Sequence, residues 1–327
     1  MPANLPPQYY EADKRFRNAK EVDDKIAALQ EMLGIMPHHK GTDKLQASLR
    51  ARIAKLSQES ERKLATARRA GFLVRREGAG QVVFAGPANT GKSQLLAALT
   101  GASPEIAMYP YTTQTPLPGM MAYKDIQIQL VDTPPLGHRS VRVLLSSVLR
   151  IADVIALVVD LGLEPVSQVE YTLGELGESH ILPRGASPAE TAAEGTYIRK
   201  MMIIGNKSDL PGAYGHLKLL TENYGARFRV SGVSALEGEG LPDLAEALYD
   251  TLEIIRVYTK APGQKADMSE PVILRRDATV GEAAEAIHKD FKRELKYAVV
   301  WGSGRFQGQT VSKGHVLRDG DVVEFHV

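Results

Sequence analysis

The sequence contains no cysteine, which excludes disulfide bridges and thiolate metal sites and fits a cytoplasmic protein. No apolar run approaches the roughly 18 residues that a membrane helix needs. Residues 1–30 lack the continuous apolar core of a signal peptide, so neither a leader nor a membrane partner is expected. The 327 residues that are present are enough for two or three domains, each with its own core.

A net charge of +1 conceals an uneven distribution along the chain. Residues 1–80 hold 16 Lys and Arg against 10 Asp and Glu, a net of +6. Residues 81–260 hold 14 against 19, a net of −5, and residues 261–327 are balanced at 10 and 10. The amino-terminal segment is therefore a candidate contact for a polyanion such as RNA, although DNA is not expected. The alternative is that these charges form an ordinary solvated helical surface.

Three parts are predicted from the apolar pattern. Residues 1–77 are predicted to be a basic helical hairpin, with one helix over residues 9–33 and a second that opens at Asp43. Residues 78–260 alternate short apolar strands with amphipathic helices, which indicates an α/β fold with a doubly wound parallel sheet. The helix that closes this part is predicted over Leu241–Val257, with a surface insertion over Gly174–Thr196 and a linker over 260–269. Residues 268–327 are predicted to be a small ubiquitin-like (β-grasp) unit.

Gly86–Ser93 fits the pattern G-x-x-x-x-G-K-[ST] between a predicted strand and a predicted helix, the context of a phosphate-binding loop. Its glycines let backbone N–H groups surround a phosphate, and the helix amino terminus adds a favourable dipole. Lys92 is expected to reach the β- and γ-phosphates and to be catalytic, and the Ser93 hydroxyl to bind Mg²⁺.

A second motif, Asn206–Asp209, follows another predicted strand and reads N-K-S-D. The Asp209 carboxylate can accept two hydrogen bonds from the N–H groups of guanine, a pair that adenine does not offer. Asn206 and Lys207 are expected to brace the loop and cover the base, and the backbone of Ser234 and Ala235 to reach the guanine oxygen.

Between the two motifs, Asp132 ends a predicted strand and is expected to hold Mg²⁺ through water. Thr113 is the favoured metal and catalytic threonine, closing over the γ-phosphate; a plain polar loop is the alternative. The residues expected to bind nucleotide are Asn89, Thr90, Gly91, Lys92, Ser93, Gln94, Asp132, Asn206, Lys207, Asp209, Ser234 and Ala235.

These motifs, with the stretch from Tyr109 to Thr113, resemble the Obg-related branch of the translation-factor-class GTPases, and the developmentally regulated GTP-binding proteins in particular. Val300-Trp301-Gly302 and Asp319–Val323 resemble the TGS domain of such GTPases. The resemblance implies binding of GTP and GDP with Mg²⁺, slow hydrolysis, and a ribosomal or RNA partner reached through residues 1–80 and the TGS domain.

Two departures bear on that function. Pro135 stands where the family has the glycine whose N–H binds the γ-phosphate, and proline has no N–H. The sensor is lost or moved, for example to Gly137, so a non-catalytic adaptor that holds nucleotide for RNA or the ribosome is the alternative to a GTPase switch. The segment from Leu136 to Val148 is also shorter than in the relatives.

Other positions leave open hypotheses. Leu136 replaces a water-orienting glutamine, His138 and Arg139 are either catalytic or plain surface residues, and Asn89 either helps to hold K⁺ or simply suits a tight loop. An ATPase is disfavoured by Asp209.

Overall fold

The computed structural model describes residues 6–18, 22–36, 46–54, 74–101, 115–136, 139–185, 195–304 and 306–326. They fall into two compact units, residues 1–71 and residues 72–327, which are described separately. Among the described residues, no helix is both long and apolar enough to cross a membrane.

The first unit is helical, with α1 over Pro7–Asn18, α2 over Val22–Ile35 and a further helical stretch over residues 46–54. The single helix predicted over residues 9–33 is therefore two helices, and α1 and α2 pack against each other. Their shared core includes Tyr9, Leu29, Met32 and Leu49. The predicted end of the helix at residue 33 is two residues short, because α2 ends at Ile35.

The second unit opens with a seven-stranded sheet in the order β2-β3-β1-β4-β6, with β5 and β7 lying beside successive halves of β6. All pairs are parallel except β2 with β3. The strands are β1 (Gln81–Ala85), β2 (Leu117–Tyr123), β3 (Ile126–Asp132), β4 (Val154–Asp160), β5 (Ile181–Pro183), β6 (Tyr197–Asn206) and β7 (Arg229–Val233).

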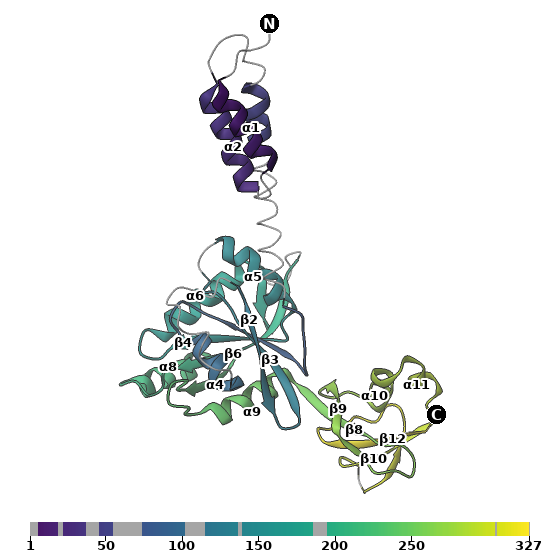
Figure 1. Cartoon of the computed structure of the whole chain (residues 1–327). Coiled ribbons are helices and arrows are strands. Elements are labelled where there is room, and N and C mark those ends of the chain that lie inside the picture. Colours follow the sequence, from purple (N-terminus) through teal and green to yellow (C-terminus); the bar gives the residue numbers. More distant parts are fainter. Residues whose placement is uncertain are drawn as a thin grey trace. The chain divides into compact units, whose positions relative to one another are not determined.

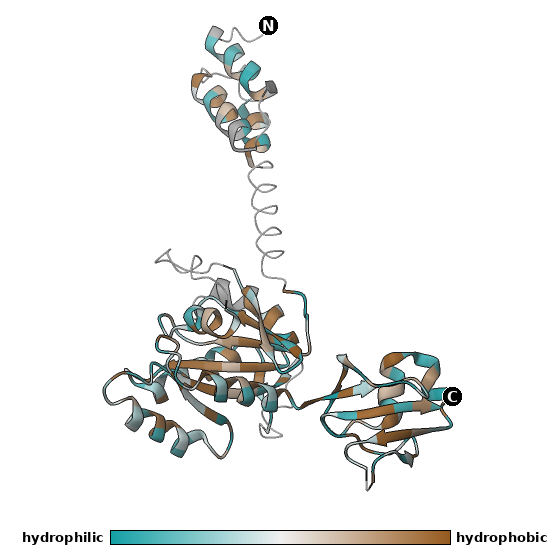
Figure 2. Ribbon diagram, turned by 60° about the horizontal axis from the view of Figure 1, so that its bottom comes forward, coloured by the Kyte–Doolittle hydropathy of each residue, from teal (hydrophilic) through white to brown (hydrophobic). Residues whose placement is uncertain are grey.

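Helices cover both faces of this sheet (Figure 1). Side chains of α5 (Arg139–Ile151), α6 (Pro165–Gly177) and α8 (Ala213–Tyr224) fill one core, and those of α4 (Lys92–Thr100) and α9 (Leu241–Leu252) fill the other. Alternation along β1 supplies both cores, because Val83 faces the first and Val82 and Phe84 the second. Figure 2 shows the hydrophobic colouring along these central strands. The predicted doubly wound parallel sheet is thus confirmed.

The surface insertion predicted over Gly174–Thr196 is only partly correct. Its first residues complete α6, and Ile181–Pro183 form β5, which pairs with β6. The pattern hides this strand because it is only three residues long and turn residues surround it. Residues 186–194 lie outside the described residues.

A second sheet of five strands forms the tail part, in the order β11-β10-β12-β8-β9, around its own core. Its strands are β8 (Ile254–Thr259), β9 (Asp267–Arg275), β10 (Tyr297–Trp301), β11 (Gln309–Val311) and β12 (Asp321–His326), with helices α10 (Val280–Ile287) and α11 (Lys289–Glu294). A capping box opens α10, because the side chains of Thr279 and Glu282 each bond the backbone N–H of the other residue.

The predicted closing helix over Leu241–Val257 is wrong in its second half. Glu253 adopts a left-handed conformation with φ of 54°, which ends α9 at Leu252, and the chain continues as β8 of the tail sheet. Since β8 pairs antiparallel with β9, residues 260–266 join two neighbouring strands of one sheet and are not an interdomain linker. The tail sheet accordingly begins at Ile254, before the predicted boundary at residue 268.

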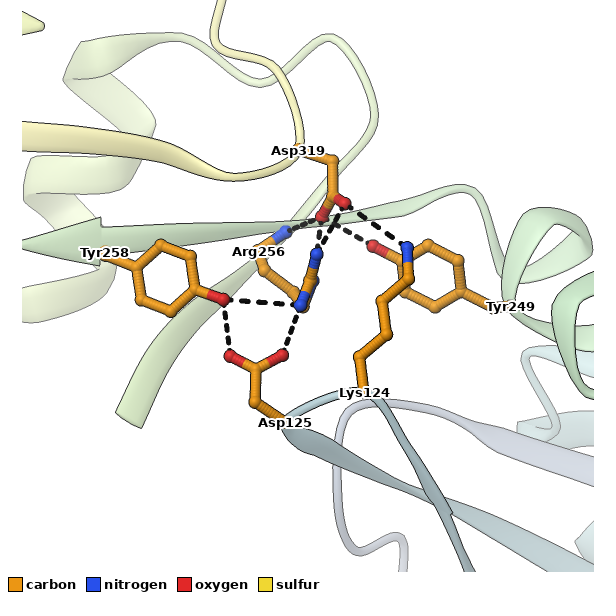
Figure 3. Close-up of polar contacts among 6 residues, drawn as sticks. All are labelled: Lys124, Asp125, Tyr249, Arg256, Tyr258 and Asp319. Carbon is orange, nitrogen blue, oxygen red and sulfur yellow. Dashed lines mark hydrogen bonds and ion pairs between the residues drawn. The ribbon is translucent and has the colours of Figure 1, made fainter. Parts of the chain in front are cut away.

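Polar contacts join the turn between β2 and β3 to the tail part (Figure 3). The Arg256 guanidinium, whose side chain is 12% exposed, bonds Asp125 of that turn and Asp319 of the tail, the latter with an Nη2–Oδ2 distance of 2.9 Å. The hydroxyls of Tyr258 and Tyr249 donate to Asp125 and Asp319 respectively. We refer to these five residues as the Arg256 cluster. Because this charge is largely shielded from water and held by several hydrogen bonds, it favours one geometry of the two parts.

Candidate functional site

The loop Gly86–Ser93 lies where β1 ends and α4 begins. Two of its glycines cannot be replaced without displacing neighbours. A Cβ on Gly86 would lie 2.3 Å from the Val158 carbonyl oxygen, and one on Gly91 would lie 2.2 Å from Asn206 Nδ2. Both also have positive φ, 159° and 85°. No side chain caps the amino terminus of α4 at Gly91, so its first N–H groups are available to an anion.

Lys92 is 6% exposed and folds back over this loop. Its ammonium donates to the carbonyl oxygens of Pro87 at 2.6 Å and Gly86 at 3.2 Å. Burial lowers the pKa of Lys92 to about 8, and the charge of Asp132 opposes that shift. A phosphate would provide this ammonium with the counter-charge that two neutral carbonyls do not.

Ser93 and Asp132 meet at the start of α4 and the end of β3. The Ser93 hydroxyl donates to Asp132 Oδ2 at 2.5 Å, and the aspartate is completely buried. A hydroxyl beside a carboxylate is a donor set of hard oxygens, which is what Mg²⁺ prefers, so the two residues fit this ion. The described residues hold no group of three His, Cys, Asp or Glu that would bind a metal without a nucleotide.

Asn206 connects the two predicted motifs. Its Nδ2 donates to the Thr90 carbonyl at 2.9 Å, and its Oδ1 accepts from the Ala235 N–H at 3.0 Å. One side chain thus connects the phosphate loop to the turn after β7. Because the Ala235 N–H is already bonded to Asn206 and that of Ser234 to Glu239, neither is free in this structure for the guanine oxygen, contrary to our expectation.

The base-recognition residues carry partners of their own. Asp209 is exposed and its Oδ1 accepts from the Ser234 hydroxyl at 2.5 Å, which leaves its other oxygen towards solvent. Lys207 bonds Asp160 Oδ2 at 2.5 Å. Sequence reasoning missed Asp160, although an acid that directly ends the buried strand β4, at the same sheet edge as Asp132 and Asn206, was a readable signal.

Among the other predicted positions, Leu136 is buried, and several lie wholly or partly outside the residues that the structure describes. Leu136 is 3% exposed within a core, so its side chain is not directed at an attacking water. Tyr171 of α6, also missed, donates its hydroxyl to the Leu136 carbonyl at 2.8 Å and thereby holds this segment against the sheet. Thr113, Gly137 and His138 lie outside the described residues, and of Arg139 only the backbone is described.

The described members of the predicted set therefore gather at the carboxyl ends of β1, β3, β6 and β7. Ligands of open parallel sheets bind at this edge. Fold and site together define a P-loop nucleotide-binding protein with a guanine-selective motif.

Comparisons with known proteins narrow that class. The family described as 50S ribosome-binding GTPase matches residues 81–184, and the TGS domain family matches residues 255–327. A GTP-binding protein of Methanocaldococcus jannaschii is 30% identical over 92% of this chain and 92% of its own length. Developmentally-regulated GTP-binding protein 1 of Xenopus laevis is 28% identical over 92% of this chain and 97% of its own length. The chain therefore belongs to the GTP-binding proteins of the Obg- and DRG-related family that carry a TGS domain.

A solved structure agrees at the level of fold. The YchF GTPase of Schizosaccharomyces pombe is similar with a TM-score of 0.53 and 16% identity, over 77% of this chain and 99% of that one.

Proposed function

We propose that this GTP-binding protein slowly hydrolyses GTP to GDP and phosphate in the presence of Mg²⁺, and that the change of nucleotide controls its action on the ribosome or on RNA. The observation that carries the proposal is the convergence of the phosphate loop, the Ser93–Asp132 pair and the Asn206–Asp209 motif at one edge of the sheet. Guanine selection is assigned to Asp209, since its carboxylate is exposed beside the brace that Asn206 forms.

In this reaction water attacks the γ-phosphorus, the bond from that phosphorus to the β–γ bridging oxygen breaks, and the proton of the water passes to phosphate and solvent. Lys92 and the uncapped N–H groups of α4 stabilise the charge that develops on the phosphate oxygens. Ser93, with Asp132 behind it and Thr113 as the proposed closing residue, would hold Mg²⁺, which would supply positive charge to the phosphates. Pro135 offers no N–H, and the Leu136 side chain is buried, so turnover is slow.

The alternative function is a non-catalytic adaptor that holds GTP or GDP for RNA or the ribosome, and Pro135 is the residue that favours it. Single-turnover hydrolysis with excess purified protein separates the two. Release of phosphate from labelled GTP, abolished by Lys92→Met, supports the enzyme. No release, even with K⁺ and ribosomal subunits present, supports the adaptor.

A potassium ion beside the phosphates is a further proposal for this site. Asn89 has a positive φ of 63° in the phosphate loop, which asparagine tolerates better than most residues, so a purely conformational role also explains it. Hydrolysis that is faster in KCl than in NaCl, and equal in both salts for Asn89→Gly, supports the ion. Equal rates for the wild type in the two salts exclude it.

A further inference from the structure

A groove opens at the edge of the parallel sheet opposite the nucleotide site. Its larger hollow, of about 750 Å³, is lined where β4 and β6 begin, where α9 ends and where β9 of the tail part ends. An adjoining hollow of about 450 Å³ lies at the start of β7 and shares Arg184, Lys200, Glu253 and Arg276 with the first. The two therefore form one continuous groove, which we call the basal groove.

The basal groove is strongly basic although residues 81–260 carry a net charge of −5. Four carboxylates line it, those of Asp153, Asp250, Glu253 and Asp277. Against them stand eight cations, Arg76, Arg184, Arg199, Lys200, Arg227, Arg229, Arg275 and Arg276, which leaves a net of +4.

Three of the four acids are already neutralised by individual cations. Arg76 pairs with Asp153 at 2.9 Å, and Arg229 with Asp250 at 2.7 Å. Arg184 and Lys200 both bind Glu253, at 2.7 and 3.0 Å; burial would raise the pKa of this carboxyl, but their hydrogen bonds lower it.

The surplus positive charge is exposed to an incoming ligand. Arg275 and Arg276 are exposed and form no side-chain hydrogen bond or ion pair with any residue that the structure describes. Arg199 is partly exposed; its guanidinium carbon lies 5.8 Å from the centroid of the Tyr197 ring, and its Nη1 donates to the Ile198 carbonyl at 2.7 Å. Arg275 and Arg276 therefore supply donors that an anion can use without breaking an existing pair.

The chemistry of the groove favours RNA over an acidic protein segment. Seven of its eight cations are arginine, whereas arginine makes up 22 of the 40 Lys and Arg in the chain. The planar guanidinium matches a phosphate in a bidentate manner better than an ammonium does. Ile198, which lines the groove and is 38% exposed, gives a base an apolar surface to lie against.

We propose that the basal groove binds the phosphate backbone of RNA, with Arg275 and Arg276 of the tail part and Arg199 of the parallel-sheet part as its principal contacts. The proposal rests on the proposed function, because it assigns the RNA contact of that function to a particular surface. The described members of the nucleotide site lie at the carboxyl ends of the strands, so RNA in the basal groove leaves GTP accessible.

Both walls of the groove are fixed before the ligand arrives. The Arg276 N–H donates to the Glu253 carbonyl at 2.7 Å, and Lys200 Nζ donates to the Leu252 carbonyl at 2.6 Å. The Arg256 cluster holds the two parts together at the β2–β3 turn (Figure 3). A preformed surface loses little conformational entropy on binding.

The experiment compares the full-length wild type with the double variant Arg275→Gln/Arg276→Gln. The probe is a fluorescein-labelled RNA hairpin, followed by anisotropy between about 50 and 200 mM KCl. Loss of two phosphate contacts weakens binding at least about tenfold at ~100 mM salt and reduces the slope of log affinity against log salt by about 2. Affinity for a fluorescent GTP analogue, measured in parallel, stays within about twofold, which separates failure of the groove from failure of the nucleotide site.

The matched control is Lys218→Gln/Arg293→Gln, which removes the same charge from exposed positions outside the groove. Thermal melts of both double variants check folding. The proposal is overturned if the wild type does not bind the hairpin, if the groove variant binds it as the wild type does, or if the control loses as much affinity. It is also overturned if poly-glutamate displaces RNA at equal charge concentration, because the groove would then select an acidic protein segment.

Discussion

The two edges of the parallel sheet use positive charge in opposite ways. At the carboxyl edge a single lysine, Lys92, is buried against carbonyl oxygens under a loop that only glycine can form at two positions. At the amino edge eight cations line an open groove, and several of them are exposed. A buried charge gives selectivity because its position is fixed, so that only a ligand of matching shape can reach it. An array of exposed charges gives affinity for any suitably shaped polyanion.

The largest effect expected from this difference concerns Lys92→Met. Removing the charge that we propose binds the phosphates is expected to weaken GTP binding by at least about 3 kcal/mol, or more than ~100-fold. The same change is expected to raise the free energy of unfolding by about 1 kcal/mol, because the desolvation that lowers the Lys92 pKa disappears. Isothermal titration with GTP and denaturant unfolding measure the two quantities. Arg275→Gln in the groove is the control, and it should change neither.

Base selection is the next effect in size. Asp209→Asn is expected to cost about 2–3 kcal/mol in GTP affinity, because the carboxylate that accepts from guanine is replaced by a neutral amide. The amide N–H₂ of the variant can donate to the 2-oxo group of xanthine, so affinity for XTP should rise. Competition of GTP, XTP and ATP against a labelled nucleotide is the measurement. If the variant still prefers GTP by the wild-type margin, Asp209 does not read the base.

Substitutions in the Arg256 cluster would show whether the nucleotide site and the basal groove depend equally on the contact between the two parts. Burial alone would raise the pKa of Asp319, but hydrogen bonds from Arg256 and Tyr249 lower it to about 2. A lowered carboxyl pKa contributes stability that is fully present above the unfolded value near 3.8 and is lost as pH falls towards 2. The wild type is expected to lose about 1 kcal/mol of unfolding free energy over this range from Asp319, because solvent screens part of the interaction of this exposed carboxylate.

Asp319→Asn is expected to lack this acid-dependent step, which denaturant unfolding at a series of pH values would measure. It should also weaken RNA binding in the basal groove more than GTP binding, because the groove has one wall in each part. An acid profile identical to that of the wild type would show that Asp319 does not stabilise the junction. Asp267→Asn serves as the control, since this carboxyl is exposed and, among the residues that the structure describes, bonds only Ser269.

The sequence predicts the nucleotide site at the carboxyl edge but not the basal groove at the amino edge, and the reason is physical. The residues of the carboxyl edge are specified locally, because a tight loop requires Gly86 and Gly91 at fixed spacing and Asp209 must directly follow its strand. The cations of the basal groove come from segments as far apart as Arg76 and Arg276, and only the folded sheet and the β8 connection bring them together. The misassignment of β8 as helix hid this junction, since hydrophobic periodicity does not show where Glu253 reverses the chain. The position of Asp160 at the end of a strand is readable locally, but its pairing with Lys207, 47 residues away, is visible only in the fold.

The smallest effect expected is the uptake of a proton by the buried Lys92 when GTP binds. With a pKa of about 8, Lys92 of the nucleotide-free protein is roughly one-tenth deprotonated at pH 7 and about three-quarters deprotonated at pH 8.5. Phosphate oxygens favour the charged form, so GTP binding should take up about 0.7 of a proton at pH 8.5 and ~0.1 at pH 7. Isothermal titration in two buffers of different ionisation enthalpy measures this uptake. Lys92→Met should abolish it, and uptake that persists in that variant would assign the proton to another group. Proton uptake in the wild type would show that burial disfavours the charged form of Lys92 until a phosphate binds. The exposed arginines of the basal groove bear no such desolvation cost, so they should show no comparable uptake.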